Sequence, residues 1–196
     1  THLSLVKTNS YAHVPVLLAE DTYPVIIYSH SFLGLNSENT MMMEEFASNG
    51  YIVFSIGHTY EHNVTLFPDG EIATDHYEYI ASIYDDHWED EKQLYQDFDA
   101  SNDEAEKRNI LGQILSVDEV SNQLMKVRTA DTIFLLNELE KMNQEEGLFQ
   151  SRLDLENIGM TGWSFGGGTT LNACLADERL KAGINIDGWP YGNSFS

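Results

Sequence analysis

Residues 162–166 have the sequence GWSFG, which matches the pattern G-x-S-x-G. The types and spacing in this pattern predict a serine nucleophile, held in a sharp turn between a strand and a helix. Glycines at both ends allow the neighbouring backbone to approach closely. We therefore predict that Ser164 is a catalytic nucleophile and that Gly162, Trp163 and Gly166 form a nucleophile elbow around it.

The sequence around the motif supports this prediction. The short apolar run 157–161 precedes the motif and predicts a strand, and the stretch 167–175 is compatible with a helix. That helix would direct its amino end at Ser164, where free amides and the helix dipole stabilise negative charge on a substrate carbonyl oxygen. The backbone N–H of Phe165 is the first expected oxyanion donor.

A second oxyanion donor is expected in the loop that follows an earlier strand. The β-branched and aromatic run 23–29 predicts this strand, and His30, Ser31 and Phe32 come directly after it. We expect the Phe32 backbone N–H to be the donor. His30 is expected to be a structural residue that is hydrogen-bonded to hold the turn, rather than the catalytic base.

Asp187 is the expected acid of a catalytic triad. It comes directly after the predicted strand 182–186, at the carboxyl edge of the sheet where catalytic groups gather in α/β folds. The alternative is that Asp187 only begins the turn 187–190, DGWP, whose composition favours turns.

The triad order in this fold is serine, acid and then histidine. All seven histidines lie between residues 2 and 87, before Ser164. We therefore expect the catalytic histidine beyond residue 196 and the sequence to be a truncated one. The chain as it stands is expected to be inactive and poorly soluble, with an open sheet edge after the strand 182–186.

The elements that must position these residues follow an alternating pattern. After the strand 23–29, Ser37 is expected to cap a helix through the methionines 41–43 to Phe46, ended by Gly50. A second buried strand is expected at 51–56. Strand, helix and strand with short links predict a parallel βαβ unit, and hence a mostly parallel, doubly wound α/β sheet.

The middle of the chain interrupts this pattern. Residues at about 60–116 lose the apolar periodicity and are rich in Asp and Glu, which predicts an acidic insertion of short helices and loops, either a lid or a plain excursion. Ser116 and Glu119 then form a capping box that predicts the start of a long helix ending near Gly147. Its expected apolar face consists of Val120, Leu124, Val127, Phe134, Leu135, Leu139 and Met142. The whole chain, 1–196, is expected to form a single domain.

Composition limits the possible partners. The formal net charge of −22 disfavours nucleic acid and anionic lipid surfaces, and no apolar run approaches the roughly 20 residues that span a membrane. Cys174 is the single cysteine, so an internal disulfide or a cysteine-rich zinc site is excluded. We expect no metal and no organic cofactor. The compartment and the oligomeric state are not determined by the sequence.

Four segments together resemble the plasma-type platelet-activating-factor acetylhydrolase family of α/β-hydrolases. They are Tyr28-Ser29-His30, residues 47–53, residues 162–167 and residues 177–189. The resemblance implies Ser164 as nucleophile, Asp187 as acid and the amides of Phe32 and Phe165 as oxyanion donors. It also implies a small-molecule or lipid-like ester as substrate. Family members usually have glycine where this chain has Ser31, and often have histidine where it has Trp163.

Two alternatives are compatible with the same motifs. Trp163 and the glycines 166–168 also resemble cutinase-type polyester hydrolases, and a dienelactone-hydrolase-like esterase is a related possibility, in both of which the acid comes from a later strand. An alternative of another class is a non-catalytic binding module that keeps the fold without the histidine.

Overall fold

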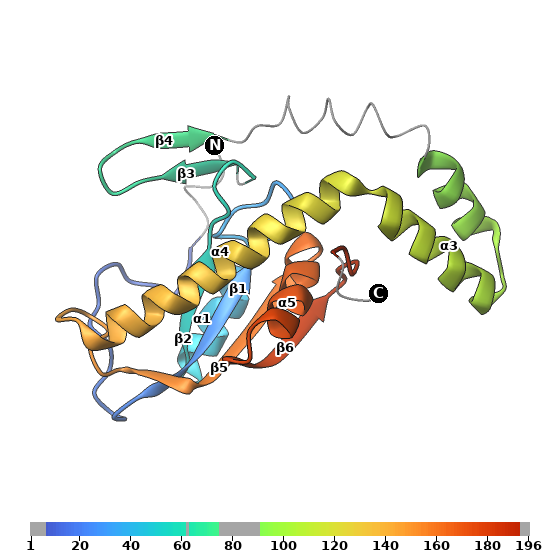
Figure 1. Ribbon diagram of the computed structural model, residues 1–196. Coiled ribbons are helices and arrows are strands. Elements are labelled where there is room, and N and C mark those ends of the chain that lie inside the picture. Colours follow the sequence, from blue (N-terminus) through green and yellow to red (C-terminus); the bar gives the residue numbers. More distant parts are fainter. Residues whose placement is uncertain (1–6, 62, 75–90, 193–196) are drawn as a thin grey trace.

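The computed structural model describes residues 7–61, 63–74 and 91–192. Its main sheet has four parallel strands in the order β2-β1-β5-β6, and a separate antiparallel hairpin, β3-β4, lies apart from it (Figure 1). The strands are β1 Tyr23–Ser29, β2 Ile52–Ile56, β3 Val64–Leu66, β4 Ile72–Thr74, β5 Leu153–Trp163 and β6 Leu180–Ile186. The helices are α1 Thr40–Ser48, α3 Glu104–Val117, α4 Glu119–Gln144 and α5 Phe165–Ala176, and residues 91–100 are also helical.

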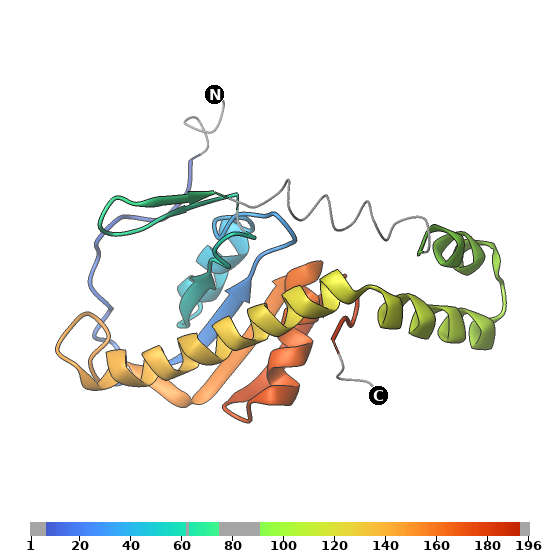
Figure 2. The same cartoon turned by 45° about the horizontal axis from the view of Figure 1, so that its top comes forward.

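The helices cover both faces of the main sheet. Helices α4 and α5 lie together on one face, and α1 lies on the other (Figures 1 and 2). The core between the sheet and α4–α5 is made of aliphatic side chains from β1, β5 and both helices, including Val25, Ile27, Leu136, Leu139 and Met160. The predicted doubly wound α/β-hydrolase fold is confirmed.

The direction of winding reverses between β1 and β5. The β1-α1-β2 unit extends the sheet to one side, and the β5-α5-β6 unit extends it to the other. In such sheets the crevice outside the carboxyl ends of the two central strands is where ligands bind. The register pairs Ser29 with Gly162, so the loop after β1 and the turn after β5 begin side by side at this crevice.

Several sequence predictions about local structure are wrong in detail. Asn39, in a left-handed conformation and without a side-chain cap, precedes α1 where Ser37 was expected, although Gly50 does follow the helix end with a positive φ of 86°. Strand β2 is only half-buried, because it lies at the edge of the sheet. Ser116 lies in the last turn of α3, and Asp118 caps α4 instead by accepting the Ser121 N–H at 2.8 Å.

The buried face of α4 also differs from the expected one. Its buried residues are Ser121, Met125, Arg128, Thr132, Leu136 and Leu139, whereas Phe134 is 64% exposed. The buried face is predicted from the spacing of the apolar residues alone. The observed buried face is shifted around the helix and includes Arg128, which binds Glu61 and the loop after β1.

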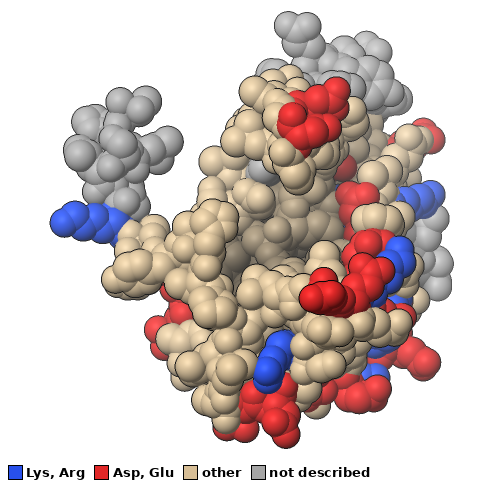
Figure 3. Space-filling view, turned by 90° about the vertical axis from the view of Figure 1, so that its left-hand side faces the viewer, with Lys and Arg blue, Asp and Glu red and all other residues tan. Residues whose placement is uncertain are grey.

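The acidic insertion contains more regular structure than predicted. It includes the β3-β4 hairpin, closed by a turn around Gly70, and the 14-residue helix α3, which projects beyond the sheet (Figure 2). Part of the predicted acidic stretch, residues 75–90, lies outside the described residues. The face in Figure 3 carries more acidic than basic side chains, in keeping with the net charge of −22.

Strand β6 forms an edge of the sheet. Among the described residues it pairs only with β5, and its apolar side chains Ile184 and Ile186 are 60% and 37% exposed. The sequence predicts an open edge after the strand 182–186, and this strand belongs to β6, which is the edge strand among the described residues. No helix in the described part of the chain has the length and apolar character needed to cross a membrane.

Candidate active site

Ser164 occupies a strained turn between β5 and α5. Its backbone angles are φ 53° and ψ −120°, a combination that costs free energy for any residue other than glycine. The Ser164 N–H donates a hydrogen bond to the Ile186 carbonyl at 2.8 Å, which holds the turn against the end of β6. Strain of this kind is typical of functional sites, and here it falls on the predicted nucleophile.

The glycines of the motif are required by the packing of backbone around Ser164. A Cβ atom on Gly162 would overlap the Gly166 carbonyl oxygen and lie 2.7 Å from that of Ser29. One on Gly188 would overlap the Ser164 carbonyl oxygen. Backbone segments therefore pack closely around residues 162–166, as the sequence analysis expects of such a turn. Trp163 is partly exposed and pairs in register with Ile186.

Helix α5 begins directly at Ser164. The Ser164 carbonyl accepts hydrogen bonds from the N–H groups of Gly167 at 2.8 Å and Gly168 at 3.2 Å. Phe165 is the first residue of the helix, so its N–H comes before the first hydrogen bond of the helix. The positive end of the helix dipole therefore lies at the predicted nucleophile.

The loop after β1 lies beside this turn. Gly34 donates its N–H to the Ser31 carbonyl at 3.0 Å, and the buried His30 ring contacts the same oxygen through Nδ1 at 2.7 Å. His30 therefore holds the turn, as expected. Phe32 follows in this loop, and its ring centroid lies 5.7 Å from that of Phe165.

Asp187 follows β6 directly, in a left-handed conformation with φ 57°. The turn after it is held by the side chain of Asn185, which accepts the Gly188 N–H at 2.8 Å and donates to the Gly188 carbonyl at 2.9 Å. The Asp187 side chain therefore does not have to shape this turn. Asp187 lines the same cavity as Ser164.

One cavity of about 270 Å³ brings together four of the predicted site residues, Phe32, Ser164, Phe165 and Asp187. No motif in the sequence points to the other lining residues, which are Tyr95, Ser121, Trp189 and Tyr191. The aromatic residues among these contact each other: the rings of Tyr95 and Trp189 are tilted with centroids 5.8 Å apart, and those of Trp189 and Tyr191 are stacked with centroids 6.3 Å apart. The wall of the cavity is therefore mainly aromatic.

The acidic insertion contributes directly to this wall. Tyr95 and Phe98, both on the helical segment 91–100, contact the ring of Trp189 after β6. Burial raises the pKa of the Tyr95 hydroxyl, and its hydrogen bond with Tyr191 acts in the opposite direction. This part of the insertion thus packs at the carboxyl edge of the sheet. Of the two expected conformations, a lid and a plain excursion, this position fits the lid.

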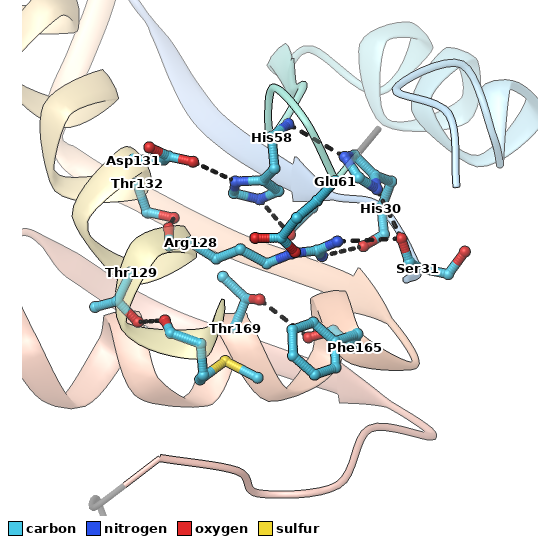
Figure 4. Close-up of polar contacts among 12 residues, drawn as sticks. His30, Ser31, His58, Glu61, Arg128, Thr129, Asp131, Thr132, Phe165 and Thr169 are labelled. Carbon is cyan, nitrogen blue, oxygen red and sulfur yellow. Dashed lines mark hydrogen bonds and ion pairs between the residues drawn. The ribbon is translucent and has the colours of Figure 1, made fainter. Parts of the chain in front are cut away.

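A buried polar cluster lies behind the loop after β1 (Figure 4). His58 contacts Asp131 through Nδ1 at 2.8 Å and Ser29 through Nε2 at 3.0 Å, and its backbone N–H donates to His30 Nε2 at 3.2 Å. Both ring nitrogens of His30 and of His58 therefore bind groups other than Ser164. Ser29, His58 and Asp131 have the residue types of a triad, but Ser29 is fully buried.

The same cluster contains an ion pair between fully buried Arg128 of α4 and Glu61, with Nε and Oε2 2.7 Å apart. Burial lowers the pKa of Arg128, while the Glu61 carboxylate acts to raise it. The sequence pattern gave no signal for this cluster, because a lone arginine on a helix is normally solvent-exposed.

The family model for platelet-activating factor acetylhydrolase, isoform II, matches residues 3–194. A platelet-activating factor acetylhydrolase from Canis lupus familiaris is 24% identical over 175 residues, and one from Cavia porcellus is 27% identical over 179 residues. These alignments cover 86% and 87% of this chain but only 36% of each relative. The chain thus spans about a third of the length of these curated relatives.

Two further matches extend the comparison. A probable 1-alkyl-2-acetylglycerophosphocholine esterase from Arthroderma benhamiae is 38% identical over 68 residues, which are 35% of this chain and 15% of that protein. The solved structure of a ferulic acid esterase from Streptomyces cinnamoneus matches with a TM-score of 0.55 and 24% identity, over 85% of this chain and 37% of that one. The structural match supports the fold.

Proposed function

Because this chain belongs to the platelet-activating factor acetylhydrolase, isoform II, family, we propose that the protein is a serine-dependent carboxylic ester hydrolase. The observation that carries the proposal is the strained conformation of Ser164 at the start of α5, beside a cavity that Asp187 also lines. Strain at a serine between a strand and a helix exposes its hydroxyl to a substrate carbonyl.

In the proposed reaction the Ser164 Oγ attacks the ester carbonyl carbon, and the proton of the hydroxyl passes to a histidine base. The tetrahedral intermediate expels the alcohol, which takes up that proton, and leaves an acyl-enzyme. Water activated by the same base then releases the acid and frees Ser164. Asp187 orients the histidine and stabilises its charged form.

The oxyanion of both intermediates is proposed to bind the backbone N–H groups of Phe32 and Phe165. The start of α5 supports this assignment for Phe165, because the dipole of the helix adds to the hydrogen bond. For Phe32, support comes from the β1–β5 register, which begins its loop beside the elbow.

The histidine base is proposed to follow Asp187 in the sequence, as the triad order requires. The rings of His30 and His58 are hydrogen-bonded to other groups, which supports the proposal that the base is a different histidine. The acid could instead come from a later strand, so Asp187→Asn is informative in its own right. It should lower kcat by several orders of magnitude if Asp187 is the acid.

The substrate is proposed to be a small or lipid-like alcohol that carries a short acyl group. The names of the matched acetylhydrolases and of the fungal acetylglycerophosphocholine esterase support a short acyl group. The modest volume and aromatic wall of the cavity support the same choice, since a long chain would need additional space.

Fluorophosphonate labelling of the full-length protein, together with hydrolysis of acetyl, butyryl and octanoyl esters, tests the proposal. The wild type should be labelled and should prefer the acetyl ester. Ser164→Ala should lose both labelling and turnover, whereas Ser29→Ala should still be labelled, because Ser29 is buried. Labelling of Ser164→Ala at the wild-type rate would refute the assignment.

A further inference from the structure

Arg128 is the largest fully buried side chain of the described residues, and its guanidinium points at the loop that carries Phe32 (Figure 4). Nε donates to Glu61 at 2.7 Å, Nη1 donates to the His30 carbonyl at 2.7 Å, and Nη2 donates to the Ser31 carbonyl at 3.4 Å. A buried charge is costly unless it is paired, and Glu61 supplies the opposite charge. Each terminal nitrogen of the guanidinium donates to one of two consecutive carbonyls of one loop.

The second of these carbonyls belongs to the peptide unit that contains the Phe32 N–H. A trans peptide is planar, so its C=O and N–H point in opposite directions, and fixing one fixes the other. The Ser31 oxygen is bound by Arg128 Nη2, by His30 Nδ1 at 2.7 Å and by the Gly34 N–H at 3.0 Å. Rotation of this peptide would break all three contacts and turn the Phe32 N–H away.

Helix α4 also acts on this oxygen by a second route. Asp131, three residues after Arg128, binds His58, whose backbone N–H donates to Nε2 of His30. Because Nε2 accepts a hydrogen bond, the proton of a neutral His30 ring is on Nδ1, and Nδ1 donates to the Ser31 carbonyl. Two side chains of one face of α4 thus hold the same peptide.

Arg128 also contacts the residue that carries the other proposed oxyanion donor. Its guanidinium carbon lies 4.8 Å from the ring centroid of Phe165, and the rings of Phe165 and Phe32 are 5.7 Å apart. A cation over an aromatic face is attractive and restricts both groups. One side chain therefore joins the loop after β1 to the first residue of α5.

We propose that Arg128 is a positioning residue for ester hydrolysis, which holds the Ser31–Phe32 peptide with its N–H directed to the oxyanion and aligns it with the amide of Phe165. This inference rests on the proposed function. It assigns to α4 a role in stabilising the transition state, although Arg128 does not itself touch the substrate. A lysine would keep the charge but could not supply the planar set of donors for Glu61, His30 and Ser31.

The test is Arg128→Lys in the full-length protein, assayed with a short-chain ester and with a trifluoromethyl ketone that forms a tetrahedral adduct with Ser164. We expect kcat to fall by about 10- to 100-fold, less than the loss of a whole oxyanion donor, with KM changed less than about threefold. Inhibition by the ketone should weaken by a similar factor, because its adduct uses the same amides.

Arg152→Lys is the matched control. Arg152 also donates to two backbone carbonyls, those of Glu20 at 3.3 Å and Asp21 at 3.2 Å, but it lies just before the start of β5. Its replacement should leave kcat, KM and ketone inhibition unchanged. If Arg128→Lys does not fold, the double variant Arg128→Gln with Glu61→Gln removes both buried charges together and should show the same loss of kcat.

The outcomes separate the two proposals. A folded Arg128 variant with the wild-type kcat and ketone affinity would overturn the positioning role, and so would a loss of kcat without weaker ketone inhibition. Absence of Ser164-dependent hydrolysis in the wild type would instead refute the proposed function, whatever the Arg128 variants do.

Discussion

The backbone of Gly166 lies directly against the carbonyl oxygen of Ser29, so that a Cβ atom on Gly166 would overlap this oxygen. The same Cβ atom would lie 2.7 Å from the His30 carbonyl oxygen. Both obstacles are backbone atoms, which cannot rotate away as a flexible side chain would. The first turn of α5 and the end of β1 are therefore at their closest possible approach at this point.

Gly166→Ala should consequently move α5 away from the loop after β1. We expect a loss of about 1–3 kcal/mol in the free energy of unfolding, typical of overpacking. Ester turnover should fall by about 10² or more, since a displacement of about 1 Å costs that much in catalysis. Urea unfolding and kcat on a short-chain ester measure the two effects.

Gly112→Ala provides the control for this prediction. Gly112 lies within α3, and a Cβ atom there would have no neighbour within 4 Å. The substitution should stabilise the protein by about 0.5–1 kcal/mol, because alanine is the better helix former. A Gly166→Ala variant as stable and active as Gly112→Ala would contradict the packing argument.

The buried face of α4 gives a second prediction. Leu139 is fully buried in the core, so Leu139→Ala should lower the free energy of unfolding by about 2–5 kcal/mol. Phe134 is 64% exposed on the same helix, and Phe134→Ala should change stability by less than about 1 kcal/mol. Equal losses of stability for the two variants would mean that Leu139 and Phe134 are equally buried, which would contradict this orientation of α4.

The strands that build the site could be predicted from the sequence because each has a short, mainly apolar segment that ends at turn residues or at the G-x-S-x-G motif, although β5 begins at Leu153, before the predicted 157–161. This holds for β1, β5 and β6, and for helix α5 after the G-x-S-x-G motif. The buried face of α4 could not be predicted, because Arg128 on this face pairs with Glu61 and His30, which are distant in the sequence. Periodicity of apolar residues carries no information about such contacts.

The β3-β4 hairpin was missed for another reason. Its strands have only three residues each, although the turn between them contains Pro68, Asp69 and Gly70, a composition that predicts a turn. Four of the predicted site residues, Phe32, Ser164, Phe165 and Asp187, line one cavity because the ends of β1, β5 and β6 meet at one sheet edge. Tyr95 reaches the same cavity from the insertion, which no local pattern could indicate.

The cap of helix α4 is Asp118, whereas the sequence predicts Ser116. Asp118 accepts the Ser121 N–H at 2.8 Å, whereas the Ser116 hydroxyl donates to the Gln113 carbonyl within α3. Asp118→Ala should cost about 1 kcal/mol of stability, and Ser116→Ala should cost almost nothing. Thermal unfolding of the two variants measures this difference. A larger loss for Ser116→Ala would restore the capping box that the sequence predicts.

An ion cluster joins α4 to the turn between α5 and β6. Arg179 binds Asp177 at 2.6 Å and Glu140 at 2.6 Å, and hydrogen bonds from the Arg179 side chain are the main cause of the lowered pKa of Asp177. Asn at position 177 can still accept the Arg179 N–H, so Asp177→Asn removes mainly the charge. At pH 7 and low salt we expect this variant to be about 0.5–1 kcal/mol less stable than the wild type.

The sign of the pH dependence follows from that lowered pKa. A carboxyl group with a lower pKa in the folded state adds stability above its unfolded pKa, about 3.9, and this stability disappears as pH falls through the folded pKa. The difference between wild type and Asp177→Asn should therefore be constant from pH 7 to about 5 and shrink below about 4. Urea unfolding across this range measures it, and added salt should reduce it at pH 7. A difference that persists unchanged to pH 2, or that grows with acid, would show that the Asp177 charge does not stabilise this turn.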